Sequence, residues 1–479
     1  RKEALFNMFV TRIVRSNWRE LTALSLLGLV SFLLMKDVNL LGDERFYSRA
    51  AIALADYVRN DTNTAEFDNT FFSRGWFMPG MSIVLSPIAF LDPGATESLL
   101  FFRAWMTLVN LFLVWLIMLE LQARSDSRLS SWLFLVTFIS PYALLYTSTL
   151  WADLTASLLA IYIALKSFSV KQWTIKSSIV LGIGLASMIY LRGQYLFLLP
   201  VYLFLILMKF ARANAIPTRD TAYVACAILL SILLLLPWSV AVSKHSGIRT
   251  LTTTLLKESQ IMAFGDRAYR QELISEGASQ NRWFAVDNTV RQKAQHNNVS
   301  VGKQYEIEHA NAFEKVTRDQ LLGHVSESIR FYLFEPSLFP ARFATASCRL
   351  NGALCGDKNR PGQQWLKFNT AISFLTVSLL ALFMLTPIKA IKHPLPGVFV
   401  KGIIFLYMVH PLFAFGHPRY LAQFAPVLAL AVCLLAERKC SLPALIGFES
   451  LSFYGLVANA GQFLAASIVF IYIWLLLFY

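Results

Sequence analysis

The chain has 479 residues, of which 56% are hydrophobic and 15% are charged, and its formal net charge is +14. Soluble proteins carry roughly a quarter charged residues, so this composition excludes an ordinary soluble protein. The apolar runs of roughly 17 to 22 residues fit membrane helices rather than the ~10-residue alternating strands of a barrel. Much of the basic excess is loop Lys and Arg, as the positive-inside rule requires, and the sequence shows no basic folded module. We therefore expect an all-α polytopic membrane protein that binds no nucleic acid.

The basic tail before the first apolar run predicts a cytoplasmic N-terminus, because it has no small-residue cleavage site and reads as an anchor. The predicted spans are Leu21–Met35, Leu100–Leu121, Ser131–Tyr146, Trp151–Leu165, Ile179–Leu191, Tyr195–Met208, Tyr223–Val242, Phe368–Thr386, Val398–Phe413 and Leu421–Ala436, with Leu451–Tyr479 forming one long or two short spans. Every basic cluster in a short loop then falls on one side, so we expect about eleven to thirteen spans. The predicted organisation is an N-terminal transmembrane module at 1–242, an extracytoplasmic loop region at 243–365 and C-terminal transmembrane helices at 366–479.

The first outer loop, 37–99, opens with two adjacent carboxylates, Asp43 and Glu44. A carboxylate pair beside the bilayer surface suits proton transfer or ion binding. An amphipathic helix is predicted to follow, with Phe46, Ala50, Leu54 and Tyr57–Val58 on one apolar stripe. Next comes a short apolar segment that contains Pro79 and Pro87; it is too short to span and suits a dipping element.

The second outer loop is predicted to carry a helix over Asn311–Phe334, where apolar residues recur at helical spacing. This helix packs flat on the protein in the simplest interpretation. Cys348 and Cys355 lie in the same loop, and in an oxidising compartment they could close a small disulfide loop or stay reduced. No CxxC spacing is present, which argues against a zinc site.

Several polar residues at the ends of distant spans are predicted to meet at the outer face. Asp153 begins one span, where the helix macrodipole alone would favour an acidic residue. Arg192 ends another; snorkelling basic side chains prefer the cytoplasmic side, so an outward arginine points to anion binding. The outer turn between two late spans contributes His417, Arg419 and Tyr420, and Pro418 can begin the following helix with free N–H groups facing an anion. Arg419 would add a bidentate phosphate ligand.

Arg74, before the dipping segment, is a weaker phosphate-binding candidate, and Arg103 at the outer end of the second span could support the site or serve as an interface anchor. Arginines and a helix N-terminus bind phosphate, and a nearby carboxylate can act as a base. The sequence has no P-loop and no GxGxxG motif for a soluble nucleotide. The predicted outer site therefore suits a lipid-linked phosphate substrate.

The order of these motifs resembles the C-type integral-membrane glycosyltransferases, the superfamily of protein O-mannosyltransferases and aminoarabinose transferases to lipid A. GDERFYSRA resembles their first-loop Asp-Glu motif, and FMPGMSIVLSP resembles their Pro-containing stretch, without the His-Pro-Pro of the mannosyltransferases. Their second span, which runs from an Arg to an Asn, resembles FFRAWMTLVNLFLVW, and their span that begins with an acidic residue resembles LYTSTLWADLTASLLAIYIAL. Their Gly-rich span that ends in Arg resembles GIGLASMIYLRGQYLFLLP, and their late Arg-Tyr turn resembles HPRYLAQFAPVLAL. Asn311–Phe334 resembles the amphipathic helix before their late spans. The likeness covers about residues 15–436 as a series of motifs in matching order.

The resemblance implies an inverting transfer of one sugar from a polyprenyl-phosphate donor to an acceptor hydroxyl of a glycan, lipid or protein. It implies a bacterial inner membrane location with the active site facing the periplasm. Asp43 would be the general base and Glu44 a supporting or acceptor-positioning carboxylate. Arg192 and Arg419, with His417, Tyr420 and Arg74, would bind the donor phosphate, with Asp153 and Arg103 as possible support. The sequence has no spaced DxD pair, so we expect no metal and no other cofactor.

Two other classes share some of these features. A lipid-linked polysaccharide polymerase or ligase would also use outer arginines, but its main outer loop would carry the key residues. A secondary transporter would show internal repeats and charges near mid-span, whereas here the charges gather at one face.

Overall fold

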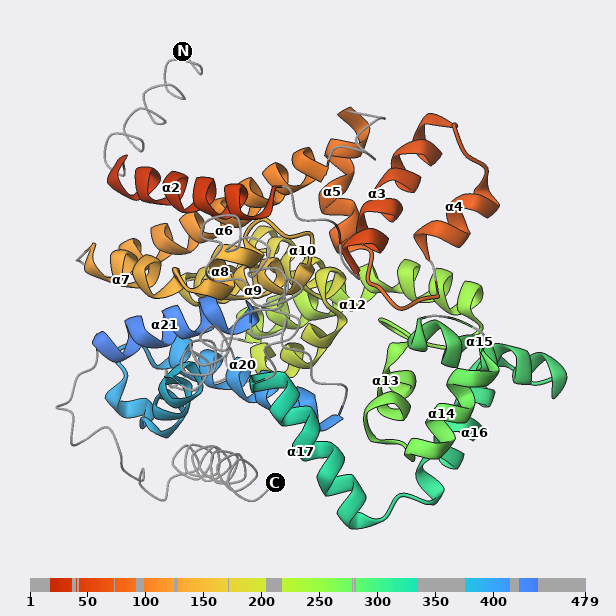
Figure 1. The fold of residues 1–479 in the computed structure, drawn as a ribbon. Coiled ribbons are helices and arrows are strands. Elements are labelled where there is room, and N and C mark those ends of the chain that lie inside the picture. The colour runs from red at the N-terminus through yellow and green to blue at the C-terminus, as the bar shows by residue number, and fades with distance from the viewer. Residues whose placement is uncertain are drawn as a thin grey trace, which may run out of the picture.

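The computed structural model describes residues 18–36, 40, 43–72, 74–91, 99–124, 128–170, 172–203, 218–277, 279, 281–334, 375–413 and 422–437. Within these ranges the protein is all-helical, as the sequence predicts (Figure 1). The helices are α2 (Trp18–Met35), α3 (Asp43–Arg59), α4 (Thr64–Phe71), α5 (Gly80–Leu91), α6 (Leu99–Arg124), α7 (Leu129–Phe138), α8 (Pro141–Tyr146), α9 (Ala152–Ser169), α10 (Ile175–Leu191), η1 (Gly193–Phe197), α12 (Thr218–Ser246), α13 (Leu255–Phe264), α14 (Arg267–Glu276), α15 (Arg282–His296), α16 (Val301–Glu314), α17 (Arg318–Phe334), η4 (Ile388–Ala390), α20 (Pro394–Phe413) and α21 (Phe424–Ala436).

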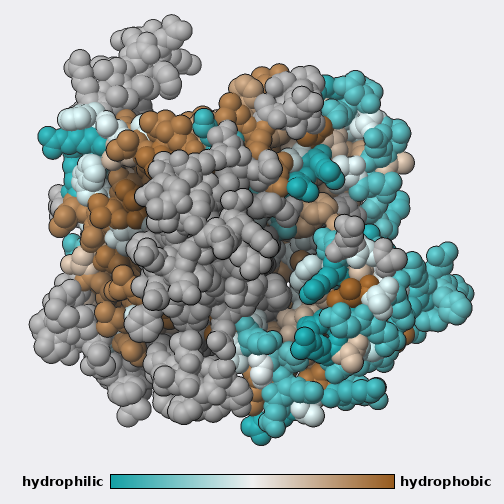
Figure 2. Space-filling view, viewed as in Figure 1, coloured by the Kyte–Doolittle hydropathy of each residue, from teal (hydrophilic) through white to brown (hydrophobic). Residues whose placement is uncertain are grey.

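Five of these helices are long and apolar enough to cross a membrane, which makes the chain a multi-pass membrane protein. They lie in α2, α6, α9, α12 and α20, and six shorter helices of 10–17 residues are also apolar. Large hydrophobic side chains such as Leu26, Leu108 and Val240 are more than half exposed, as expected of surfaces that face lipid. Figure 2 shows apolar side chains gathered on the side of α2, α6 and α7, and hydrophilic ones on the side of α3, α4 and α13–α16.

The bundle is built around α9, most of whose length is buried between α6, α10, α20 and α21. Small residues allow close helix packing, as is common in membrane bundles. Gly182 of α10 is an example, because a Cβ there would lie 2.8 Å from the backbone oxygen of Ala227 in α12. The consequence for function is that the N-terminal end of α9 is enclosed by its neighbours.

The predicted amphipathic helix of the first outer loop is present as α3, and its apolar stripe is buried only in part, at Ala50. The buried residues include Tyr47, Ala51 and Ala55, whereas Tyr57 is 39% and Val58 59% exposed. The reason is that α3 packs closely on α5, and close packing selects small residues over large apolar ones. The dipping segment forms α5, with Pro87 inside the helix.

Helices α13 to α16 form a second hydrophobic core of their own, around Ile261, Leu273, Val290 and Tyr305. In Figure 1 this group lies beside α3–α5, away from α2, α7 and α21. The continuous helix expected over Asn311–Phe334 is not formed, because α16 ends at Glu314 and α17 begins at Arg318. Thr317 is the N-cap residue of α17, because its side-chain hydroxyl accepts a hydrogen bond from the backbone N–H of Gln320.

Candidate active site

The second of the two predicted carboxylates, Glu44, is buried in an ion pair with Arg103. Their side chains are both 0% exposed, and Glu44 Oε1 lies 3.5 Å from Arg103 Nη1. The same oxygen accepts from the backbone N–H of Leu150 at 2.9 Å, and Arg103 Nη1 donates to the carbonyl of Ser148 at 3.1 Å. The first turn of α3 is thereby fixed to α6 and to the loop before α9.

That loop is itself held by polar side chains from two spans. Asn110 of α6 is fully buried; its amide donates to the carbonyl of Thr147 at 2.9 Å and accepts from Thr155 at 2.8 Å. The Ser148 hydroxyl lies 2.7 Å from the hydroxyls of both Ser31 and Thr107. Asn110 follows Arg103 by seven positions, which is about two helical turns, so both residues face this loop.

A second ion pair joins Asp153, at the start of α9, to Arg192, just after α10. Arg192 Nη2 lies 2.6 Å from Asp153 Oδ1, and the side chains are 15% and 2% exposed respectively. Gln423, only 1% exposed, donates its amide to the same oxygen at 2.8 Å. Gln194 in turn donates to the Gln423 side-chain oxygen at 2.6 Å.

The two ion pairs are close neighbours. Leu150, whose N–H is bound by Glu44, precedes Asp153 by three residues, so their Cα atoms are at most about 11 Å apart. Asp43 stands directly before Glu44 in the first turn of α3 and is half-buried. The structure thus brings together four of the predicted residues: Glu44 and Arg103 in one pair, and Asp153 and Arg192 in the other.

The dipping segment also reaches this region. A Cβ on Gly80, the first residue of α5, would lie 2.5 Å from the backbone carbonyl of Tyr190, so only glycine allows this approach. Tyr190 lies two residues before Arg192. The first outer loop therefore contacts the chain beside the Asp153–Arg192 pair.

Arg74 lies in a different cluster, between the first outer loop and α15. Its guanidinium donates to Asp287, and to the side-chain oxygen of Asn288 at 2.8 Å, and stacks over Phe284 with 4.7 Å between Arg74 Cζ and the ring centroid. Arg291 also binds Asp287, at 2.8 Å. Arg74 thus ties the first outer loop to α15, and its role as a phosphate ligand stays a prediction.

Behind Arg74 lies a second buried carboxyl group, Glu258 of α13. Tyr305 donates to Asp287 at 2.7 Å and lies 3.3 Å from Glu258 Oε2, while Glu258 Oε1 is buried without a hydrogen bond. Burial, assisted by the charge of Asp287, holds the pKa of Glu258 well above its usual range. The group is therefore suited to hold a proton rather than a negative charge.

Three predicted phosphate-site residues, His417, Arg419 and Tyr420, lie outside the described residues, as do Cys348 and Cys355. Sequence reasoning missed Gln194 and Gln423, which orient the charged residues, and noticed Asn110 only as part of the motif in the second span. Their signal was available: an amide side chain in or beside an apolar span requires a polar partner.

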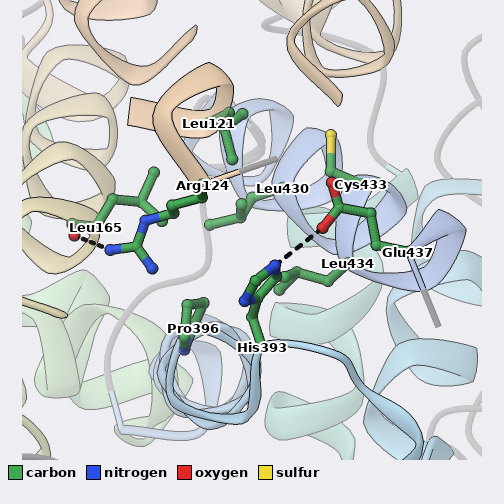
Figure 3. A pocket seen from close by; sticks show the side chains of 9 residues that line it. All are labelled: Leu121, Arg124, Leu165, His393, Pro396, Leu430, Cys433, Leu434 and Glu437. Atoms are coloured by element: carbon green, nitrogen blue, oxygen red, sulfur yellow. Dashed lines mark hydrogen bonds and ion pairs between the residues drawn. The ribbon is translucent and has the colours of Figure 1, made fainter. Parts of the chain in front are cut away.

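A small cavity lies at the opposite end of the bundle (Figure 3). It is lined by Arg124 at the end of α6, Leu165 near the end of α9, and His393 and Glu437. Arg103 and Arg124 are 21 residues apart on one helix, or roughly 31 Å, which is about one bilayer core. The cavity has a volume of about 10 Å³, which suits a single water molecule, so it is no candidate for a substrate site.

No protein-family model and no curated protein sequence matches this chain. Among solved structures, the chain is similar to the archaeal oligosaccharyltransferase AglB from Archaeoglobus fulgidus, solved in complex with an inhibitory peptide and a dolichol-phosphate. The identity is 13% and the TM-score 0.45, over 96% of this chain and 56% of that one, so this chain spans little more than half of its length. Proteins this dissimilar need not share chemistry.

Proposed function

We propose that this protein is an inverting glycosyltransferase that moves one sugar from a polyprenyl-phosphate donor to an acceptor hydroxyl at the outer membrane face. The observation that carries the proposal is that Asp43 directly precedes Glu44, whose buried pair with Arg103 neighbours the Asp153–Arg192 pair at one end of the bundle. A half-buried carboxylate is suited to accept a proton, and the nearby arginine Arg192 to bind a phosphate. The proposed setting is a bacterial inner membrane with the site toward the periplasm.

In the proposed reaction, the Asp43 carboxylate takes the proton of the acceptor hydroxyl as its oxygen bonds to the anomeric carbon. The bond from that carbon to the phosphate oxygen breaks, and its electron pair leaves with the phosphate. The products are a glycoside of inverted configuration and polyprenyl phosphate, and the proton passes from Asp43 to water. Arg192, with Arg419 as predicted, would stabilise the leaving phosphate by about 1.5–3 kcal/mol for each charge-assisted hydrogen bond.

Glu44 is proposed to act through position. Both of its described partners, Arg103 and the N–H of Leu150, are buried with it, so it fixes Asp43 relative to the loop before Asp153. We also propose that the reaction needs no metal ion. An arginine neutralises each of the two buried carboxylates, Glu44 and Asp153, which reduces their attraction for a cation. The proposed acceptor is a hydroxyl of a glycan, lipid or protein.

The test is transfer by the purified protein from a synthetic polyprenyl-phosphate sugar, comparing wild type, Asp43→Asn and Asp61→Asn. Asp61 is an exposed carboxylate in the same outer region and serves as the matched control. Loss of a general base should lower the rate by roughly 10²–10⁴-fold, while binding of the donor is retained. Retention of more than about a tenth of the activity by Asp43→Asn would contradict the assignment, because a base contributes far more than tenfold.

A further inference from the structure

The ion pair between Asp153 and Arg192 presents a problem for a phosphate site, because the arginine already carries a counter-charge. The two side chains are unequally covered: Asp153 is 2% exposed and Arg192 15%. A phosphate that approaches Arg192 from its exposed side would therefore have the Asp153 carboxylate on the far side of the guanidinium.

The carboxylate is held in place from behind. Gln423 donates to Asp153 Oδ1, and its own side-chain oxygen accepts from Gln194. The backbone carbonyl of Gln423 accepts from the hydroxyl of Ser157 at 2.8 Å. The amide is thus fixed at both its backbone and its side chain, and it offers Asp153 a donor that remains when Arg192 turns to another anion. A buried carboxylate with such a donor can stay ionised through that exchange.

We propose that Asp153, oriented by the positioning residues Gln423 and Gln194, is a built-in counter-anion that weakens binding of the phosphate product more than binding of the donor. The inference rests on the proposed function. The donor is a phosphodiester with one negative charge, whereas the product is a monoester with about −1.5 to −2 charges at pH 7. Because repulsion scales with charge, a fixed carboxylate near the phosphate favours exchange of product for new donor.

The size of the effect follows from Coulomb's law. For a phosphate roughly 7–10 Å from the carboxylate and an effective dielectric constant near 20, each unit of phosphate charge changes affinity by about 15- to 60-fold. The additional half to full charge of the product should then be disfavoured by about tenfold relative to the donor.

The experiment measures the dissociation constants of polyprenyl phosphate and of its methyl ester, a phosphodiester probe, without acceptor. Wild type is compared with Asp153→Asn, Gln423→Leu and the control Gln122→Leu. Gln122 is a half-buried glutamine near the other end of α6, bonded to Ser131 at 3.1 Å, so its loss costs packing without touching the site. We expect Asp153→Asn to tighten monoester binding about tenfold more than diester binding, and to lower kcat and KM together because product release slows.

Gln423→Leu retains both charges and should change the monoester-to-diester ratio in the same direction but less. It gives the same comparison should Asp153→Asn fail to fold. If wild type binds both probes but neither variant changes the ratio, Asp153 has a structural role only and the inference is wrong. If wild type binds neither probe, the proposed function fails and the inference fails with it. The wild-type measurement thus separates the two failures.

Discussion

The buried pair Glu44–Arg103 gives the sharpest test of how the site is held. Arg103→Met removes the cation while keeping a long apolar side chain, and it leaves Glu44 charged in a fully buried position. Breaking a buried pair in this way costs about 3–5 kcal/mol. The pair Lys166–Glu120, with 2.7 Å between Lys166 Nζ and Glu120 Oε1, provides the control, because its cation is 58% exposed even though Glu120 is only 12% exposed. Lys166→Met should cost at most about 1 kcal/mol.

A third variant distinguishes the loss of the ion-pair attraction from the cost of burying an unpaired Glu44 carboxylate. Replacing Glu44 by Leu together with Arg103→Met removes both charges, but it leaves the N–H of Leu150 without its acceptor, which costs about 1–3 kcal/mol. The double variant should therefore be more stable than Arg103→Met alone. The assay is reversible unfolding of the detergent-solubilised protein, followed by tryptophan fluorescence. A cost for Arg103→Met no greater than that for Lys166→Met would refute the buried pair, and so would a double variant that is no more stable than the single one.

Three further predictions concern the phosphate ligands, the metal and the buried Glu258. Arg192→Ala and Arg419→Ala should each weaken binding of the lipid carrier, measured without acceptor, and lower turnover by roughly 10²-fold or more. Replacement by Lys should restore activity only in part, because an ammonium group cannot copy the bidentate guanidinium. Cysteine labelling that placed either position in the cytoplasm would exclude a shared site. Turnover in excess chelator should equal turnover without it, and inhibition that manganese or magnesium reverses would contradict metal independence. Because the pKa of Glu258 is raised from 4.5 by burial, its contribution to stability should be complete below pH 4.5 and be lost as pH rises toward the folded-state value. Unfolding measured against pH should show this slope in wild type and in the exposed control Glu306→Gln, and a slope unchanged in Glu258→Gln would assign it to another group.

The sequence predicted the all-helical fold and the carboxylates and arginines at the ends of the spans. Hydropathy and loop charge indicate where a span ends, and a polar residue at that end stands out against the apolar residues of the span. The packed face of α3 could not be identified from its apolar stripe. A helix on a membrane protein can turn its large apolar side chains, such as Val58, toward lipid and pack its alanines inward, so hydrophobicity does not mark the packed face.

The sequence could not predict which buried polar side chains pair with one another. Nothing in the motif Asp43–Glu44 shows that the second carboxylate is buried by Arg103, since the two residues lie 59 positions apart. The same holds for Gln423 and Asp153, which are separated by 270 positions. Such pairings depend on which helices are neighbours, and the neighbours of α9 come from parts of the chain far apart in sequence.

The contact between Arg74 and Asp287 has a consequence for how the protein is made. The two residues are 213 positions apart in the chain. At roughly 5–20 residues per second, Asp287 leaves the ribosome about 10–40 s after Arg74. During that interval several spans are inserted, and the first outer loop lacks the carboxylate that anchors it. The loop that carries the proposed base thus reaches its final arrangement late, and a nascent chain that stops before α15 is expected to expose that loop to membrane-bound proteases and chaperones.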